Sequence, residues 1–152
     1  VARDFPEVTL DVVIVDAMAA WLVRAPERFD VVVAGNLYGD ILSDLASELS
    51  GSLGLAGSVM AGDRQCAAQA QHGSAPDIAG RDKANPTSMI LSVAMLLEWL
   101  GARHGRADLV AAGTAMRGAL DRLLADPATR TADLGGSLGC AAFGAAVAAG
   151  VA

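Results

Sequence analysis

The chain has 152 residues, of which 53% are hydrophobic, and its formal net charge is −6. This length allows one or two small domains with a well-buried core. Nucleic-acid binding is disfavoured because the charge is negative and the Lys and Arg residues are scattered, and membrane insertion is disfavoured because no apolar run approaches the roughly 20 residues of a spanning helix.

Two short apolar segments in the first third of the chain predict strands, each followed by a helix. Residues 8–15 alternate between apolar and polar before becoming continuously apolar, and the helical stretch that Asp16 opens ends at Pro26. Residues 29–34 form a Val-rich run typical of a buried strand, and a helix is expected at about residues 39–49. The order strand, helix, strand, helix predicts an α/β protein.

The rest of the chain predicts loops followed by three helices. Residues 50–80 are rich in Gly and show little sustained periodicity, so we expect crossover and binding loops there. Asn85-Pro86 is a strong helix start, and apolar residues recur up to Gly101, where this buried helix is expected to end. A second helix is expected at about residues 107–125, and a final Ala-rich helix follows a further loop.

Two carboxylates in the second predicted helix form a candidate metal site. Asp40 and Asp44 are four residues apart, so they share one face, with their Cβ atoms about 5 to 6 Å apart. A hard divalent cation with oxygen ligands, Mg²⁺ or Mn²⁺, would relieve their repulsion. Asp16, at the expected strand-to-helix turn, is a third candidate ligand. Taken alone, the spacing is more typical of a solvated acidic cluster that the helix dipole favours.

The segment from His72 to Gly80 is a candidate nucleotide site. The chain contains neither a GxGxxG nor a GxxxxGK[ST] motif, so such a site needs other support. The segment combines small residues that let a ligand approach the backbone, an imidazole and one carboxylate, Asp77. An acid can bind the ribose hydroxyls of NAD and repel a 2′-phosphate. On composition alone, an ordinary Gly/Pro turn is the more common structure.

The isolated cysteines, His104 and the tryptophans give no sign of catalysis. Cys66 and Cys140 lie far apart without CxxC spacing, so a reducing cytoplasm is the simpler expected location. His104 is interpreted as a solvated residue of a short connection, and Trp21 and Trp99 as packing residues. The N-terminus has neither an initiator Met nor a signal-peptide pattern, so we expect a piece of a longer protein.

Five motifs, taken in order, resemble those of the β-decarboxylating dehydrogenases of the isopropylmalate/isocitrate family. They are NLYGDILSD (36–44), GSLG (51–54), HGSAPDIAG (72–80), ANPT (84–87) and DLGG (133–136). The resemblance implies an α/β, isopropylmalate dehydrogenase-like two-lobed fold, of which this chain is the C-terminal half. It places residues 1–50 in the metal, substrate and dimerisation lobe and residues 51–152 in the NAD-binding lobe. Strands from the missing half would complete both sheets.

The same resemblance assigns roles to individual residues. Asp40 and Asp44 match the metal-binding aspartates of the family. Asp16 matches the metal and substrate aspartate that reaches into the partner subunit's site, which implies a homodimer with shared active sites. A further group matches the adenosine-binding segment: His72, Gly73, Ser74, Ala75, Asp77, Ile78 and Asn85. NAD is implied because Asp77 and Ile78 stand where NADP-using relatives carry a Lys-Tyr type pair.

The implied reaction is oxidation of a 2-hydroxy acid at C2, with hydride transfer to NAD, followed by loss of the β-carboxylate. The simplest expected substrate is 3-isopropylmalate, with isocitrate, tartrate or another malate as rivals. The family's Arg cluster, Tyr acid and Lys base belong to the first half of the enzyme. The chain departs from the family at Gln69, where relatives carry Glu, and at Cys140, where Thr is usual. The alternative from another class is a non-catalytic NAD-binding, dimerisation or regulatory module.

Overall fold

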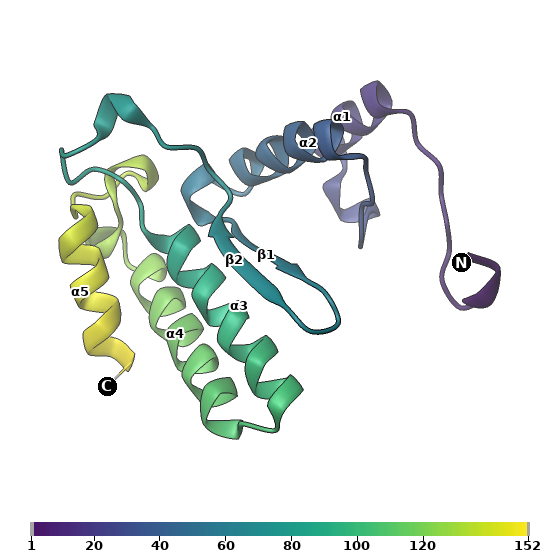
Figure 1. Ribbon diagram of the computed structural model, residues 1–152. Helices are drawn as coiled ribbons and strands as arrows, with labels where there is room; N and C mark the ends of the chain where they lie inside the picture. The colour runs from purple at the N-terminus through teal and green to yellow at the C-terminus, as the bar shows by residue number, and fades with distance from the viewer. Residues whose placement is uncertain (1, 152) are drawn as a thin grey trace. The chain divides into compact units, whose positions relative to one another are not determined.

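The computed structural model describes residues 2–151, which form two compact units that divide between Ala46 and Ser47. The first unit contains α1 (Val15–Arg24) and most of α2 (Asn36–Leu49). The second contains β1 (Gly57–Ala61), β2 (Cys66–Ala70), α3 (Thr87–His104), α4 (Ala107–Ala125) and α5 (Cys140–Val151) (Figure 1). No helix among the described residues is long and apolar enough to cross a membrane.

The core of the first unit forms where α1 packs against α2. Met18 and Leu22, four residues apart, share one face of α1 and cluster with Leu42 of α2, and all three side chains are buried. Trp21 lies beside this cluster on α1, and the guanidinium of Arg28 covers its ring at 4.0 Å from the centroid. The contact is a cation–π interaction, so Trp21 has a packing role.

The strands expected at residues 8–15 and 29–34 do not form. Neither segment pairs with a strand among residues 2–151, and both are irregular chain with exposed apolar side chains. Val12 is 91% exposed and Val33 is 92% exposed. Alternating hydrophobicity predicts which side chains of a strand face the core, but a strand also needs a partner for its backbone N–H and C=O groups. The pattern is present, and the described part of the chain holds no such partner.

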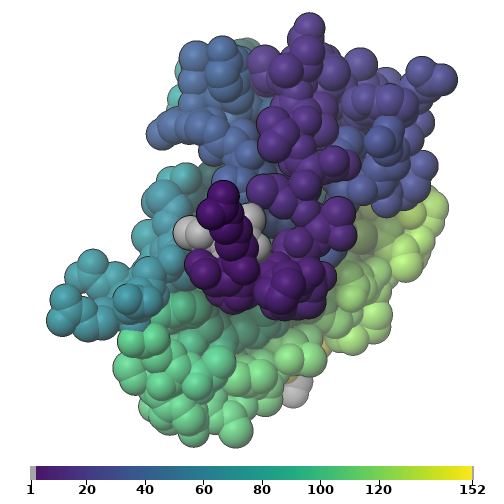
Figure 2. Space-filling model, turned by 90° about the vertical axis from the view of Figure 1, so that its right-hand side faces the viewer, coloured from purple at the N-terminus to yellow at the C-terminus, as the bar shows by residue number. Residues whose placement is uncertain are grey.

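A β-hairpin occupies residues 57–70, where only loops were expected. β1 and β2 are antiparallel, with Gly57 opposite Ala70 and Ala61 opposite Cys66. The turn is closed by a hydrogen bond from Gly62 N–H to the Gln65 carbonyl at 2.8 Å. Figure 2 shows the teal hairpin end projecting beyond the green helices of the same unit. The expectation was wrong because these strands are built largely from Gly, Ala and Ser, whose weak β-propensity hides the alternation.

Helix α3 binds the hairpin through two fully buried serines one turn apart. The Ser92 hydroxyl accepts a hydrogen bond from Ser58 N–H of β1 at 2.9 Å, and its proton lies between two acceptors at 2.7 Å, the Gln69 carbonyl of β2 and the Ser88 carbonyl four residues earlier in α3. The Ser88 hydroxyl makes the corresponding pair of bonds with backbone beside the open end of the hairpin. A Cβ on Gly57 would lie 2.8 Å from a leucine side chain of α3. The hairpin therefore depends on small residues that allow a close approach to the helix.

Helices α3, α4 and α5 stack side by side in the second unit (Figure 1). The buried residues that α4 and α5 contribute to the core are Ala119, Leu120, Phe143 and Val147. Partly buried apolar side chains of α3, including Ile90 and Leu91, pack against this cluster. The stack gives the loops at its ends a rigid support.

Helix α3 continues past Gly101, the residue at which it was expected to end. It ends at His104, and Gly105 caps it in the left-handed region with a φ of +64°. Gly101 serves packing instead, because a Cβ there would lie 2.6 Å from Val110 Cγ2 of α4. His104 is exposed, although it lies in the last turn of the helix and not in a connection.

Candidate functional site

Asp40 and Asp44 lie one turn apart on α2 in the first unit. Both residues are exposed, and the i,i+4 spacing brings them to the same helix face, as the sequence predicts. Their four carboxylate oxygens suit a hard divalent cation, but two side chains leave most of its coordination positions to other ligands. Among residues 2–151, no three His, Cys, Asp or Glu side chains gather into a metal-binding group.

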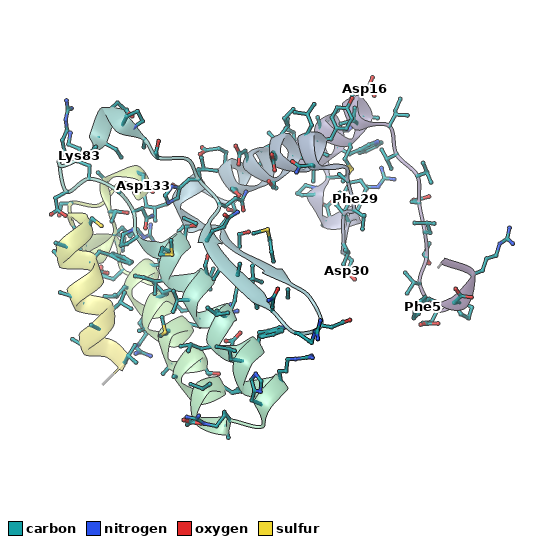
Figure 3. All side chains as sticks on the ribbon, in the orientation of Figure 1. Phe5, Asp16, Phe29, Asp30, Lys83 and Asp133 are labelled. Carbon is teal, nitrogen blue, oxygen red and sulfur yellow. The ribbon has the colours of Figure 1, made fainter. Side chains whose placement is uncertain are left out.

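Asp16 lies in the first turn of α1 and is exposed (Figure 3). Its Oδ1 accepts a hydrogen bond from Ala17 N–H at 2.7 Å. The structure does not bring Asp16 into one cluster with Asp40 and Asp44 of the same chain. The assignment of Asp16 to the site of a partner subunit stays a prediction.

The predicted nucleotide residues, His72 to Gly80 and Asn85, belong to the second unit and lie on irregular chain; residues 72–85, which connect them, are called the nucleotide segment below. His72 Nδ1 lies 2.8 Å from the Gly73 carbonyl oxygen. Ala75 has a φ of +41°, which is uncommon for a residue with a side chain. It precedes a 3₁₀ turn, Pro76–Ile78, in which Asp77 is exposed and Ile78 is half-buried. The Asp77 carboxylate is thus available at the surface of a constrained loop.

Gly73 and Ser74 leave space above this loop. A Cβ built on Gly73 meets no atom within 4 Å, and its φ lies outside the left-handed region, so neither packing nor backbone geometry requires glycine there. Ser74 is exposed. Because Gly73 has no side chain, a ligand can approach its backbone closely. The assignment of this segment to the adenosine end of NAD stays a prediction.

Asn85 differs from the other predicted nucleotide residues because its side chain faces the protein. The residue is 7% exposed, its Nδ2 donates to Asp133 Oδ2 at 3.0 Å, and its Oδ1 accepts from Thr87 N–H at 3.0 Å. A Cβ on Gly54 would lie 2.8 Å from the Asn85 Cβ, so position 54 must be glycine. The side-chain amide of Asn85 thus links the nucleotide segment to Thr87 of α3 and to Asp133.

Asp133, to which the sequence assigned no role, is the centre of this network (Figure 3). Ser52 Oγ donates to its Oδ2 at 2.5 Å and Thr131 Oγ1 to its Oδ1 at 2.5 Å, in addition to the bond from Asn85. Burial raises the pKa of Asp133, but the bonds from Ser52, Thr131 and Asn85 more than offset this effect and lower the pKa below its ordinary value. The DLGG motif marks the residue, but not its partners.

Known proteins resemble this chain over almost its whole length. Residues 1–147 match the model of the isocitrate/isopropylmalate dehydrogenase family. The chain is 50% identical over 147 residues to an isocitrate/homoisocitrate dehydrogenase of Thermus thermophilus and 51% identical over 131 residues to a 3-isopropylmalate dehydrogenase of Salinibacter ruber. These alignments cover 97% and 86% of this chain, but 42% and 34% of the two relatives.

Solved structures agree with the sequence relatives. The crystal structure of isocitrate dehydrogenase from Methylococcus capsulatus matches 99% of this chain with a TM-score of 0.89 and 39% identity. A β-decarboxylating dehydrogenase from Thermococcus kodakarensis matches 99% with a TM-score of 0.77 and 35% identity. The chain spans 43% and 42% of these two proteins. It belongs to the isocitrate/isopropylmalate dehydrogenase family and has the α/β fold of that family.

Proposed function

We propose that this chain is part of an enzyme that uses NAD and Mg²⁺ or Mn²⁺ to oxidise a 2-hydroxy acid and release its β-carboxylate as CO₂. The observation that carries the proposal is the exposed pair Asp40 and Asp44 on one face of α2, in a chain about half identical to dehydrogenases of this family. A divalent ion needs oxygen ligands in fixed positions, and two carboxylates on one helix face provide them.

Asp40 and Asp44 would hold the divalent ion, and Asp16 of a second copy would add a further ligand and contact the substrate. When bound, such an ion acts as a Lewis acid on the C2 oxygen of the substrate and stabilises the charge that decarboxylation leaves. The protein contributes rigidity, because both carboxylates project from one helix whose buried face is fixed against α1. The resemblance of Asp16 to the family's aspartate that reaches into the partner subunit's site leads us to propose a homodimer with shared active sites.

The nucleotide segment would bind the adenosine end of NAD. Asp77 would accept hydrogen bonds from the ribose hydroxyls, and its negative charge would exclude the 2′-phosphate of NADP. His72, Ser74 and Ile78 would surround the adenosine, while Gly73 and Ala75 would let it approach the backbone. The exposed carboxylate beside the constrained backbone of Ala75 supports this assignment.

We propose 3-isopropylmalate as the first substrate to test, with isocitrate, homoisocitrate and tartrate as rivals. The relatives of similar identity are named for three of these four acids, isocitrate, homoisocitrate and 3-isopropylmalate, and so do not separate them. A non-catalytic NAD-binding, dimerisation or regulatory module is the second candidate, and it predicts NAD binding without oxidation of any hydroxy acid. A panel of the four acids, with NAD and Mn²⁺, separates the candidates.

The ribose assignment is tested with Asp77→Lys in the protein as its gene encodes it. Removing a charge-assisted hydrogen bond of about 1.5 to 3 kcal/mol should weaken NAD binding roughly 10- to 100-fold. Asp63→Lys, the same change at the exposed hairpin turn, is the matched control and should leave binding unchanged. Isothermal titration with NAD and NADP measures both constants. Unchanged NAD affinity in Asp77→Lys would exclude the ribose role.

A further inference from the structure

We propose that the loop of residues 131–139, here called the C-terminal loop, and the first turn of α5 that follows it position the nucleotide segment through two carboxylates, Asp133 and Asp82. The inference rests on the proposed function, since it assigns positioning residues to the NAD site. The proposed function concerns residues that contact NAD, whereas Asp133 and Asp82 contact the nucleotide segment and not NAD. The sequence analysis placed Asp133 in the DLGG motif without a role in the site, and Asp82 lies outside all five motifs.

The first anchor is the bond between Asp133 and Asn85. Both ends of the Asn85 amide are occupied, by Asp133 Oδ2 and by Thr87 N–H, and the residue is 7% exposed. Because the residue is buried and bonded at both ends of its amide, we infer that Asn85 contributes to the site by where its backbone lies. Asp133 fixes that position, because its carboxylate is itself held by Ser52 and Thr131.

The second anchor is Asp82, three residues earlier in the segment. Its Oδ1 accepts a hydrogen bond from Ala141 N–H at 2.8 Å, and its carbonyl accepts from Cys140 N–H at 3.1 Å. Asp82 thereby caps α5 from a distant part of the sequence. It does so with a φ of +54°, and a Cβ on Gly139 would lie 2.9 Å from the Asp82 carbonyl oxygen. The contact holds Asp82 in a conformation that non-glycine residues rarely adopt.

The C-terminal loop is rigid enough to act as a support. Thr131 is fully buried, and its carbonyl accepts hydrogen bonds from the N–H groups of Leu134 and Gly136. Leu138 N–H donates to the Arg130 carbonyl at 3.0 Å, so the loop closes on itself. A Cβ on Gly136 would lie 2.1 Å from the Arg130 carbonyl oxygen, so the chain cannot open there without losing this close contact.

The nucleotide segment needs such support because its own backbone is unfavourable. Ala75, Gly80 and Asp82 all have positive φ values. In Ala75 and Asp82, which carry a Cβ, this conformation is energetically unfavourable. If a loop adopts its binding conformation only part of the time, its apparent dissociation constant rises by the inverse of that fraction. Losing an anchor should therefore weaken NAD binding without touching the ligand contacts.

The test compares NAD affinity in Asp133→Ala and Asp82→Gly with that in the wild type, using the protein as its gene encodes it. Glycine at position 82 keeps the backbone conformation accessible and removes only the carboxylate. The dissociation constant of NAD should rise about tenfold in Asp133→Ala and severalfold in Asp82→Gly. The KM for NAD should rise equally, with kcat and the KM for the hydroxy acid unchanged. Asp126→Ala, whose carboxylate caps an unrelated turn, should bind NAD as the wild type does.

A rescue variant tests whether the bond between Asp133 and Asn85 is what maintains NAD affinity. Asn85→Asp combined with Asp133→Asn reverses the donor and acceptor of the first anchor and should recover most of the NAD affinity that either single change loses. NAD affinity within twofold of wild type in both Asp133→Ala and Asp82→Gly overturns the inference, as does an equal loss in Asp126→Ala. If Asp77→Lys loses NAD while the anchor variants retain it, the proposed function survives and only the positioning role fails. A wild type that does not bind NAD overturns both.

Discussion

Ser92 is the residue whose removal best tests how the hairpin is held. Ser92→Ala leaves Ser58 N–H and the Gln69 carbonyl without the hydroxyl that joins them to α3. A fully buried unsatisfied group costs about 1 to 3 kcal/mol, and these two are partly buried, so the sum should be about 2 kcal/mol. At roughly 4 °C per kcal/mol for a unit of this size, the Tm should fall by about 8 °C.

The assay is urea unfolding with hydrogen exchange of the Ser58 amide, which should lose protection in Ser92→Ala. Thr114→Ala is the matched control, because Thr114 Oγ1 also donates to the carbonyl four residues earlier, at 3.0 Å, but bonds to no strand. Its stability should change by less than about 0.5 kcal/mol. Equal effects of the two substitutions, or unchanged protection of Ser58, would show that the serine does not hold the hairpin.

Two further stability predictions concern the same unit. Gly139→Ala should lower the free energy of unfolding by about 1 to 3 kcal/mol because the new Cβ overlaps Asp82. Gly144→Ala is the control and should not lower it, because no atom lies within 4 Å of the new Cβ. Equal effects of the two substitutions in thermal unfolding would contradict this prediction. Glu98→Gln should cost only about 0.5 kcal/mol at pH 7, because the Glu98–Arg117 pair is partly exposed. A hydrogen bond from Arg117 lowers the pKa of Glu98, so the difference should be complete above pH 4.5 and vanish as the pH falls through the lowered value; a difference that persists in acid would refute the assignment.

The positions of the helices could be predicted to within a few residues from apolar periodicity and from the Pro and Gly residues near their ends. α4 covers the expected residues 107–125, since a sustained apolar period ends at Asp126-Pro127. Gly101 misled the prediction of the end of α3, because a glycine needed for contact with α4 looks like a helix terminator in sequence. The hairpin could not be predicted from its own residues, since its bonds to Ser88 and Ser92 come from a distant helix.

Part of the candidate site could also be predicted from the sequence, and part could not. The spacing of Asp40 and Asp44 predicts a shared helix face, because helix geometry alone sets the distance between the two residues. The role of Asp133 could not be predicted, because its three side-chain donors lie at positions 52, 85 and 131, and only folding brings them together. Asn85 was predicted to bind the cofactor, and that stays a prediction; the bonds of its amide to Asp133 and Thr87 could not be predicted from the motif.

The exposed segments of the first unit would make protein concentration a variable of any experiment on residues 1–152 alone. Residues 8–14 and 31–33 combine solvent-facing Val, Leu and Ile side chains with backbone that no described strand pairs. Extended segments of this kind add readily to one another or to the edges of other sheets. A specific dimer saturates as concentration rises, whereas strand addition continues into larger species. Subunit stoichiometry therefore has to be measured over a dilution series, where the two processes separate.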